Sequence, residues 1–246
     1  ADVDFSEYKT NTLRRRTRHR CALNRCDNIA DYISILINSE EERRLLRQSL
    51  LIGATRFFRD HTPWVHLEKT VLPQLVSKLS DGDQLRIWVT ACSTGEEPYT
   101  IAMVVNDVLE ASKKNLKVKI FTTDIDSQSL SFAAKGCYPA NISADVSPAR
   151  LAHYVDEVDG KYQVKHFLRE MLSIAPHELT KNAGFSKMHL VSCRNVLIYM
   201  KPKLQQQVLR LLHFTLAPEG FLFLGGSETL GEYEVDFDVL DAKSKI

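Results

Sequence analysis

The chain has 246 residues, with 32 Lys and Arg against 31 Asp and Glu, so its formal net charge is +1. This balance excludes a global attraction to nucleic acid, and a hydrophobic fraction of 44% is enough for a sizeable core. No apolar run reaches the length of a bilayer and no leader opens the chain, so we expect a cytoplasmic protein, whether whole or a piece of something longer. The five cysteines lack metal-ligand spacing, which predicts reduced thiols and no metal site.

Residues 1–50 are predicted to form a small helical domain. Helix formers or apolar residues at three- and four-residue intervals occur in NTLRRRTRHRCAL, NIADYISILIN and SEEERRLLRQSLLI. Ser39 with three following glutamates is a typical helix start. The first stretch carries five arginines: Arg14, Arg15, Arg16, Arg18 and Arg20. Such a run predicts a surface that binds nucleic acid, an acidic membrane or an acidic protein, and the alternative is a solvated face compensated by neighbouring acids.

From residue 85 onwards short apolar runs alternate with amphipathic stretches. The runs LRIWV, VKIFTT, MHLVSC and GFLFLGG suit buried strands, and residues 98–110 and 203–216 place apolar side chains on one face of a helix. This alternation predicts crossover connections, hence an α/β fold with a mainly parallel sheet over residues 51–246. Open sheets of this kind bind ligands at the carboxyl ends of their strands.

One segment breaks the alternation. In LAHYVDEVDGKYQV, alternating residues lie on both sides of Asp159-Gly160, which is a strong turn signal for a β-hairpin. We therefore expect a small antiparallel β insertion over about residues 138–175, between the second strand and the later ones.

Acids stand after the first two predicted strands, where nucleotide-binding folds usually carry glycines. The turn CSTGEE has one glycine followed by Glu96 and Glu97, and the second strand ends at Asp124. An acid at the end of the second strand typically binds ribose hydroxyls. The two glutamates would repel a phosphate but suit a cationic nucleoside such as S-adenosylmethionine. Ordinary capping of the helix is the alternative role for Glu96 and Glu97.

Seven motifs then identify a family by their order and spacing: LRRRTRHR, TRFFRD, CSTGEEPYTIAM, TTDIDSQSL, HELT, VSCRNVLIYM and APEGFLFLGGSE. On these motifs, which cover nearly the whole chain, the protein resembles the chemotaxis receptor methyltransferases of the CheR type. The resemblance implies a Rossmann-like methyltransferase domain with S-adenosylmethionine as cofactor and S-adenosylhomocysteine as product. It also implies the activity, which is protein-glutamate O-methylation of chemoreceptors.

The resemblance implies the residues at the methionine end of the cofactor. Thr55 and Arg59 match positions that hold the methionine portion, and either Glu96 or Glu97 matches the acid that binds its ammonium group. The family often has Asn two residues before that Thr, whereas this chain has Gly53.

At the nucleoside end, the resemblance makes Asp124 the acid that binds the ribose. Glu178 and Leu179 match the pair beside the adenine, where the backbone matters more than the side chain. Asn195 and Val196 match the loop in VSCRNVLIYM.

The acceptor of the implied reaction needs no general base, because a glutamate with a reference pKa near 4.3 is already an anion at neutral pH. Arg59 and Tyr199 are the donors we expect at the acceptor carboxylate, with Arg59 positioning it through two hydrogen bonds. The alternatives are an ion pair between Arg59 and Asp60, and a purely structural role for Tyr199.

Partners follow from the same resemblance. In the family, the basic helix faces the acidic methylation region of receptor helices, so we expect this partner and neither nucleic acid nor membrane insertion. Some members dock a receptor carboxyl-terminal peptide on the small β-subdomain through a longer loop. The tight DEVDGK turn predicts independence from that peptide. Two rival functions are a non-catalytic S-adenosylmethionine-binding scaffold domain and a methyltransferase for a small molecule or nucleic acid.

Overall fold

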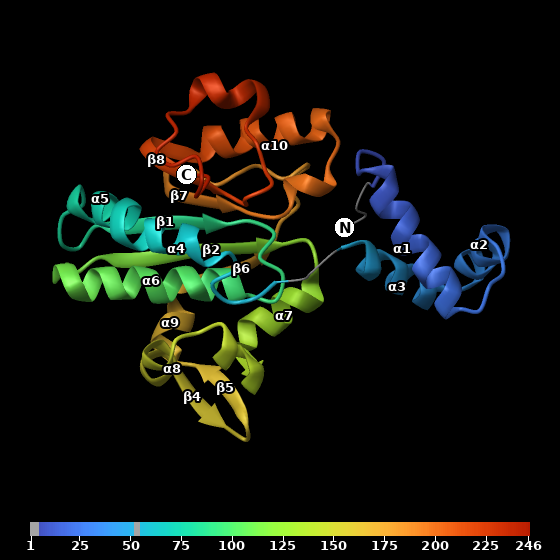
Figure 1. Ribbon diagram of the computed structural model, residues 1–246, viewed down its shortest axis with the longest axis horizontal. Coiled ribbons are helices and arrows are strands. Elements are labelled where there is room, and N and C mark those ends of the chain that lie inside the picture. The colour runs from blue at the N-terminus through green and yellow to red at the C-terminus, as the bar shows by residue number, and fades with distance from the viewer. Residues whose placement is uncertain (1–4, 52–54) are drawn as a thin grey trace.

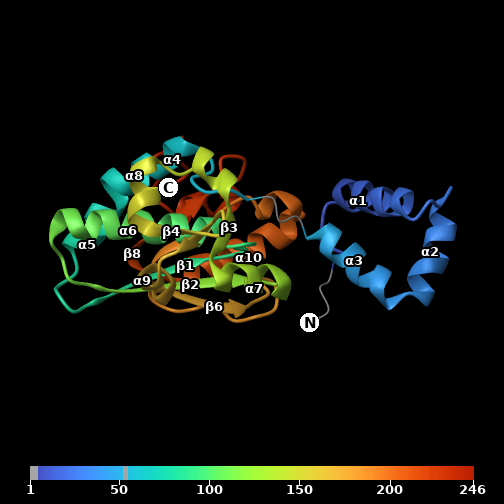
Figure 2. The same ribbon diagram turned by 90° about the horizontal axis from the view of Figure 1, so that it is seen from below.

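The structure is a computed structural model that describes residues 5–51 and 55–246. Its first three helices form a unit that stands apart from the sheet in both views, and these are α1 (Thr10–Leu23), α2 (Ile29–Asn38) and α3 (Glu40–Leu50) (Figures 1 and 2). The Ser39 side chain accepts a hydrogen bond from the Glu42 N–H, which confirms the predicted start of the third helix. Inside the unit the Glu42 carboxylate binds the Arg20 guanidinium at 2.9 Å and the Tyr32 hydroxyl at 2.6 Å. The three helices are therefore joined by a polar centre.

Five parallel strands form the main sheet, in the order β6-β2-β1-β7-β8. They are β1 (Gln84–Val89), β2 (Lys117–Asp124), β6 (Leu172–Pro176), β7 (Met188–Cys193) and β8 (Leu216–Leu224). The arrowheads of β1 and β2 point towards the helical unit (Figure 1). This arrangement confirms the predicted α/β class with a mainly parallel sheet and a separate helical domain.

Helices cover both faces of the sheet because the side chains of each strand alternate between them. Ile87 packs into the core below α6 (Glu96–Ser112), whereas Trp88 packs into the core below α10 (Pro202–Thr215). Three shorter elements pack beside α6: α4 (His61–His66), the π-helical turn η1 (Leu67–Val71) and α5 (Leu72–Ser77). The near-continuous apolar strands of the sequence reflect this burial on two faces.

A second, three-stranded antiparallel sheet lies in the order β3-β5-β4. It contains β3 (Cys137–Pro139), β4 (Val155–Val158) and β5 (Lys161–Val164), with α7 (Ser127–Lys135), η2 (Ala140–Ala144), α8 (Pro148–Tyr154) and α9 (His166–Met171) around it. Asp159 and Gly160 join β4 to β5 with φ values of 51° and 70°, which confirms the hairpin. Residues 172–176, inside the range expected for the insertion, instead pair with β2 as the edge strand β6.

Two short 3-10 helices complete the described chain: η3 (Leu197–Tyr199) and η4 (Gly231–Asp236). None of the five cysteines forms a disulfide, and three of them are buried. Over residues 5–51 and 55–246, no helix has the length and apolarity needed to traverse a bilayer. No cluster of His, Cys, Asp or Glu that could hold a metal ion occurs in the same ranges.

Candidate functional site

The predicted site residues lie at the carboxyl ends of adjacent strands. Between β1 and β7 the strand order reverses, because the chain leaves β1 through α6 to β2 on one side while β7 lies on the other. Such a switch point opens a crevice at the carboxyl edge of a parallel sheet. Asp124 ends β2, Glu96 and Glu97 begin the helix after β1, and Asn195 follows β7. Residues far apart in the sequence therefore meet at one edge.

The loop between β1 and α6 has an unusual backbone. Ala91, Ser93 and Gly95 have φ values of 48°, 50° and 96°, so alternate residues take the left-handed conformation. For a non-glycine residue this costs roughly 1–3 kcal/mol, which the surrounding packing has to offset. A Cβ on Gly95 would lie 2.7 Å from the Ala133 Cβ and 2.8 Å from the Tyr138 hydroxyl. The one glycine of the turn is therefore required by close packing as well as by its φ.

Asp124 is held at the end of β2 by backbone groups. Its Oδ2 accepts a hydrogen bond from the Ser93 N–H and its Oδ1 one from the Asp126 N–H, both at 2.8 Å. Burial raises the pKa of Asp124, and these backbone hydrogen bonds partly oppose the rise. A carboxylate has about four lone-pair sites, so each oxygen can accept a further bond. The Asp124 carboxylate is therefore held in a fixed orientation in which its two oxygens can accept hydrogen bonds from two further donors.

A small cavity of about 90 Å³ lies beside Asp124. Four predicted residues line it, namely Asp124, Asn195, Val196 and Tyr199, together with Tyr8, Leu50, Leu51, Ala91, Ser93, Ile125, Asp126 and Ser129. The wall from the helical domain was not predicted, and it is held in place by the Lys9 N–H, which donates to the Tyr199 carbonyl at 2.9 Å. No local pattern marks Tyr8 or Leu50 as site residues, because the fold alone brings them here.

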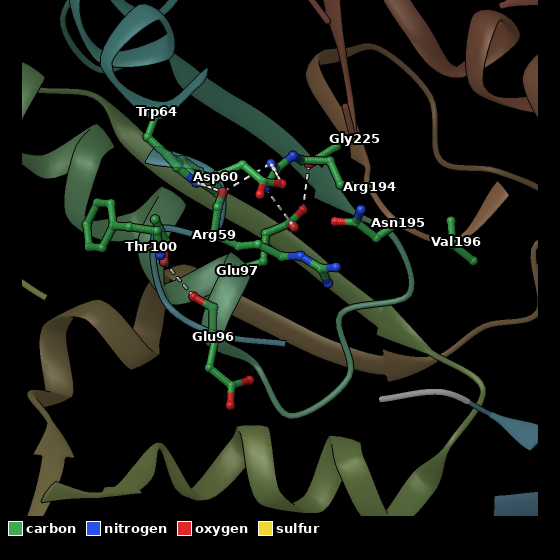
Figure 3. Close-up of polar contacts among 12 residues, drawn as sticks. Arg59, Asp60, Trp64, Glu96, Glu97, Thr100, Arg194, Asn195, Val196 and Gly225 are labelled. Carbon is green, nitrogen blue, oxygen red and sulfur yellow. Dashed lines mark hydrogen bonds and ion pairs between the residues drawn. The ribbon is translucent and has the colours of Figure 1, made fainter. Parts of the chain in front are cut away.

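The two adjacent glutamates point in different directions (Figure 3). The Glu97 side chain is 14% exposed, and its carboxylate accepts hydrogen bonds from the Ser192 hydroxyl at 2.6 Å and from Arg194 at 3.5 Å. The Glu96 carboxylate points the other way and accepts from the Thr94 hydroxyl at 2.7 Å. Burial raises the pKa of both carboxyls, and for Glu97 the charge of Arg194 opposes this rise. In Figure 3 the Glu97 carboxylate points to the side of the α6 start where Arg59 and Arg194 lie, and the Glu96 carboxylate points away from them.

Arg194 is the main polar residue of the site that the sequence reasoning missed. Its side chain is 0% exposed and packs against two rings that contact each other, 5.0 Å from the Trp64 centroid and 4.6 Å from that of Phe223. Nη1 faces Glu97, and Nη2 donates to the Arg59 carbonyl at 3.2 Å. VSCRN places this arginine directly after a buried strand, which is a signal that was available, but a sequence does not reveal that a guanidinium is buried.

The backbone of Arg59 is held by hydrogen bonds from side chains of other segments. Its carbonyl accepts from the Trp64 indole N–H at 2.7 Å as well as from Arg194, and its neighbours Phe58 and Asp60 have positive φ values of 47° and 60°. The Asp60 carboxylate lies 3.5 Å from Arg194. The contacts that hold this segment therefore come from Arg194, directly after β7, and from Trp64 in α4.

Several predicted residues are not among those that line the small cavity: Thr55, Arg59, Glu96, Glu97, Glu178 and Leu179. Glu178 follows β6, where its carboxylate accepts from the Thr180 hydroxyl at 2.9 Å and lies 3.3 Å from the Lys181 ammonium. Leu179 is buried in the core below α10. Gly53, where the family often has Asn, is outside the described residues.

The arginines of α1 differ in their surroundings. Arg14, Arg15 and Arg18 are exposed, whereas Arg16 is half-buried. Arg20 is bound to Glu42 inside the helical unit, and this hydrogen bond raises the pKa of Arg20. The exposed basic face of α1 therefore consists of Arg14, Arg15 and Arg18.

These features define an α/β domain with a crevice at the carboxyl edge of its sheet. Asp124 lies there at the position that typically binds ribose, and two glutamates begin α6 where a phosphate-binding loop would carry several glycines. Comparison with known families agrees. Residues 53–246 match the family defined as "CheR methyltransferase, SAM binding domain", and residues 1–51 match "CheR methyltransferase, all-alpha domain". The chain belongs to the CheR methyltransferase family, and S-adenosylmethionine is the cofactor of its α/β domain.

Curated relatives of the chain include proteins named as chemotaxis methyltransferases. The chain is 36% identical over 193 residues to "Chemotaxis protein methyltransferase 1" of Pseudomonas aeruginosa, covering 76% of this chain and 70% of the relative. It is 32% identical over 235 residues to "Chemotaxis protein methyltransferase" of Borreliella burgdorferi, covering 93% and 83%. An uncharacterized 104.1 kDa protein of Rhodobacter capsulatus is 36% identical over 245 residues, which cover 100% of this chain but only 26% of that relative.

Proposed function

We propose that this protein transfers the methyl group of S-adenosylmethionine to glutamate side chains of chemoreceptor-type signalling proteins in the cytoplasm. The products are glutamate methyl esters and S-adenosylhomocysteine. The observation that carries most weight is the shared cavity of Asp124, Asn195 and Tyr199. A second observation is that the Glu97 carboxylate lies on the same side as Arg59 (Figure 3). The names of the P. aeruginosa and B. burgdorferi relatives support a role in chemotaxis.

The donor groups of the crevice fit this cofactor. Asp124 has acceptor capacity left for the two ribose hydroxyls, and Asn195 and Val196 line the same cavity. Of the two glutamates, we assign Glu97 to the ammonium group, because its carboxylate faces the side of Arg59 while that of Glu96 faces away. Thr55 and Arg59 complete the methionine end, and Glu178 and Leu179 the adenine end. When bound, the cofactor supplies an electrophilic methyl group on a positively charged sulfur.

The protein's own contribution is orientation and exclusion of water. The acceptor glutamate is ionised at neutral pH, so no residue has to remove a proton. Holding a carboxylate in line for attack contributes roughly 7–11 kcal/mol to lowering the barrier. Arg59 is the positioning donor, since its backbone is fixed by Trp64 and Arg194, and Tyr199 is the second donor at the cavity wall.

The partner is an acidic region of receptor helices. Arg14, Arg15 and Arg18 form an exposed basic face in a chain that is otherwise close to neutral. Opposite charge across such a contact accelerates association and fixes its register more than it adds affinity. The small antiparallel sheet has a tight turn at Asp159-Gly160, which favours docking without a receptor tail peptide.

Incubation with methyl-labelled cofactor and receptor fragments tests the activity directly. We expect base-labile label that mass spectrometry maps to glutamate side chains, and none on fragments in which those glutamates are replaced by glutamine. Binding of S-adenosylhomocysteine without transfer to any receptor fragment would favour the rival, a non-catalytic scaffold domain. Base-stable label would indicate a different acceptor group.

A further inference from the structure

A buried carboxylate lies behind the loop that follows β7. The Glu228 side chain comes from the segment after β8, and the residue is 2% exposed. Its Oε1 accepts hydrogen bonds from the N–H groups of Val196 at 2.9 Å and Leu197 at 2.8 Å. Its Oε2 accepts from Asn195 at 3.0 Å and from Gly225 at 2.6 Å. Four backbone donors therefore use all the acceptor sites of one carboxylate.

Three of these donors are consecutive residues, so the loop forms a concave anion-binding site of the kind called a nest. Asn195 adopts a left-handed conformation with φ of 60°, which turns successive N–H groups towards the same point. In many proteins a nest binds an external anion. Here the carboxylate of Glu228 occupies it, so the chain supplies its own anion.

The approach of the two segments leaves no room for a side chain at Gly225. A Cβ there would lie 2.8 Å from the Glu228 Oε2 and 2.9 Å from the Asn195 nitrogen. Gly225 lies beside Arg194 and Asn195 in Figure 3. The end of β8 and the loop after β7 are thus joined through one carboxylate, at a spacing that only glycine permits.

The loop that Glu228 binds carries residues of the candidate site. Asn195 and Val196 line the cavity beside Asp124, and Tyr199 follows in the same short helical turn. We propose that Glu228 is a positioning residue for cofactor binding, because its carboxylate fixes the backbone of residues 195–197 and thereby places Asn195, Val196 and Tyr199. This inference rests on the proposed contact of the cofactor with Asn195 and Val196.

Glu228→Gln tests the proposal with almost no change of shape. The new amide nitrogen is a donor, so two of the four N–H groups lose their acceptor and face another donor. We expect the variant to fold, with a cooperative melting transition, and to bind S-adenosylhomocysteine about 10-fold or more weakly by calorimetry. Glu232→Gln, the same change at an exposed acid of η4, is the matched control and should bind as the original protein does.

Two readouts separate positioning from general destabilisation. In the ligand-free protein, hydrogen exchange should accelerate in peptides that contain residues 195–199 and stay unchanged in β1 and β2. Glu228 also lines a cavity of about 780 Å³ between β8 and the carboxyl-terminal segment, which gives a small anion access. Formate should therefore restore part of the affinity of Glu228→Ala, while sodium chloride at equal ionic strength should not.

Wild-type affinity in a folded Glu228→Gln variant would overturn the proposal, and so would exchange that accelerates evenly across the domain. Neither readout uses a receptor, so failure of the methyl-transfer assay leaves the inference intact. If the original protein itself did not bind S-adenosylhomocysteine, the proposed function would fail, and the local exchange of residues 195–199 would still decide whether Glu228 fixes the loop.

Discussion

Arg194 and Glu97 form an ion pair inside the protein, with 3.5 Å between Nη1 of the arginine and Oε2 of the glutamate. The Arg194 side chain is 0% exposed and that of Glu97 is 14% exposed. Removing the arginine therefore leaves a mostly buried charge uncompensated, which typically costs roughly 3–5 kcal/mol. We expect Arg194→Met to lower the free energy of unfolding by about this amount in urea denaturation at neutral pH. Glu97→Gln in the same chain should recover part of the loss.

Arg86→Met is the control for this prediction. Arg86 also lies over a ring, 4.8 Å from the Phe121 centroid, but it is only half-buried. Its replacement should cost less than about 1 kcal/mol. Equal losses in the two variants would contradict the view that the Arg194 side chain compensates a buried charge.

Arg59→Ala separates binding from transfer. If Arg59 mainly positions the acceptor carboxylate, its loss should reduce the affinity for S-adenosylhomocysteine only moderately and reduce methyl transfer by at least about 100-fold. Arg56→Ala, at a largely exposed arginine three residues earlier, should change neither quantity. Full transfer activity of Arg59→Ala would remove Arg59 from the mechanism.

Cofactor affinity should rise with pH. Burial raises the pKa of Asp124 above its ordinary 3.8 and that of Glu97 above 4.5. An acid with a raised pKa stabilises the folded protein fully when the pH is below its ordinary, unfolded-state pKa. This stabilisation is lost as the pH rises through the raised, folded-state pKa. Because the ionised forms bind ribose hydroxyls and an ammonium group best, binding becomes tighter over the same window and levels off above it.

Calorimetry with S-adenosylhomocysteine between pH about 5 and about 7.5 checks this linkage. Protons should be released on binding at the acidic end of the range, which buffers of different ionisation enthalpy reveal. Asp124→Asn should bind more weakly and show a flatter pH profile. An affinity that falls as the pH rises would contradict the assignment of Asp124 and Glu97 as acceptors.

The basic face of α1 should control the association with receptors. Reversing two exposed charges, in Arg14→Glu with Arg18→Glu, should raise the KM for an acidic receptor fragment about 10-fold at low salt and leave affinity for S-adenosylhomocysteine unchanged. The difference should shrink as salt screens the charges. The matched pair Lys113→Glu with Lys117→Glu, at exposed positions at the far end of the sheet, should leave this KM unchanged.

The hairpin turn predicts that a receptor tail peptide is dispensable. Because β4 and β5 are joined by only Asp159-Gly160, no longer loop extends from the small sheet at this point. Receptor fragments with and without their carboxyl-terminal peptide should be methylated with the same kcat/KM. Micromolar binding of such a peptide in calorimetry would show that this expectation is wrong.

The strands at the centre of the sheet could be predicted because burial on both faces leaves a clear apolar run, as in LRIWV and MHLVSC. The edge strand β6 could not, since LSIAP is short and only partly buried, and it follows an insertion of other structure. The direction of the Glu97 side chain could not be predicted either. Adjacent residues on a helix are rotated by about 100° around its axis, and no local pattern shows whether Glu96 or Glu97 faces the crevice.

The family, the cofactor class and the place of Asp124 after the second strand could all be inferred from the amino-acid sequence, because they depend on motifs and periodicity within short segments. Three features became visible in the folded protein alone: Arg194 is buried beside Glu97, Tyr8 and Leu50 complete the cavity wall, and Glu228 occupies the nest of residues 195–197. All three have one cause. Burial and hydrogen-bond partners are set by contacts between segments that are distant along the chain, and no local pattern records them.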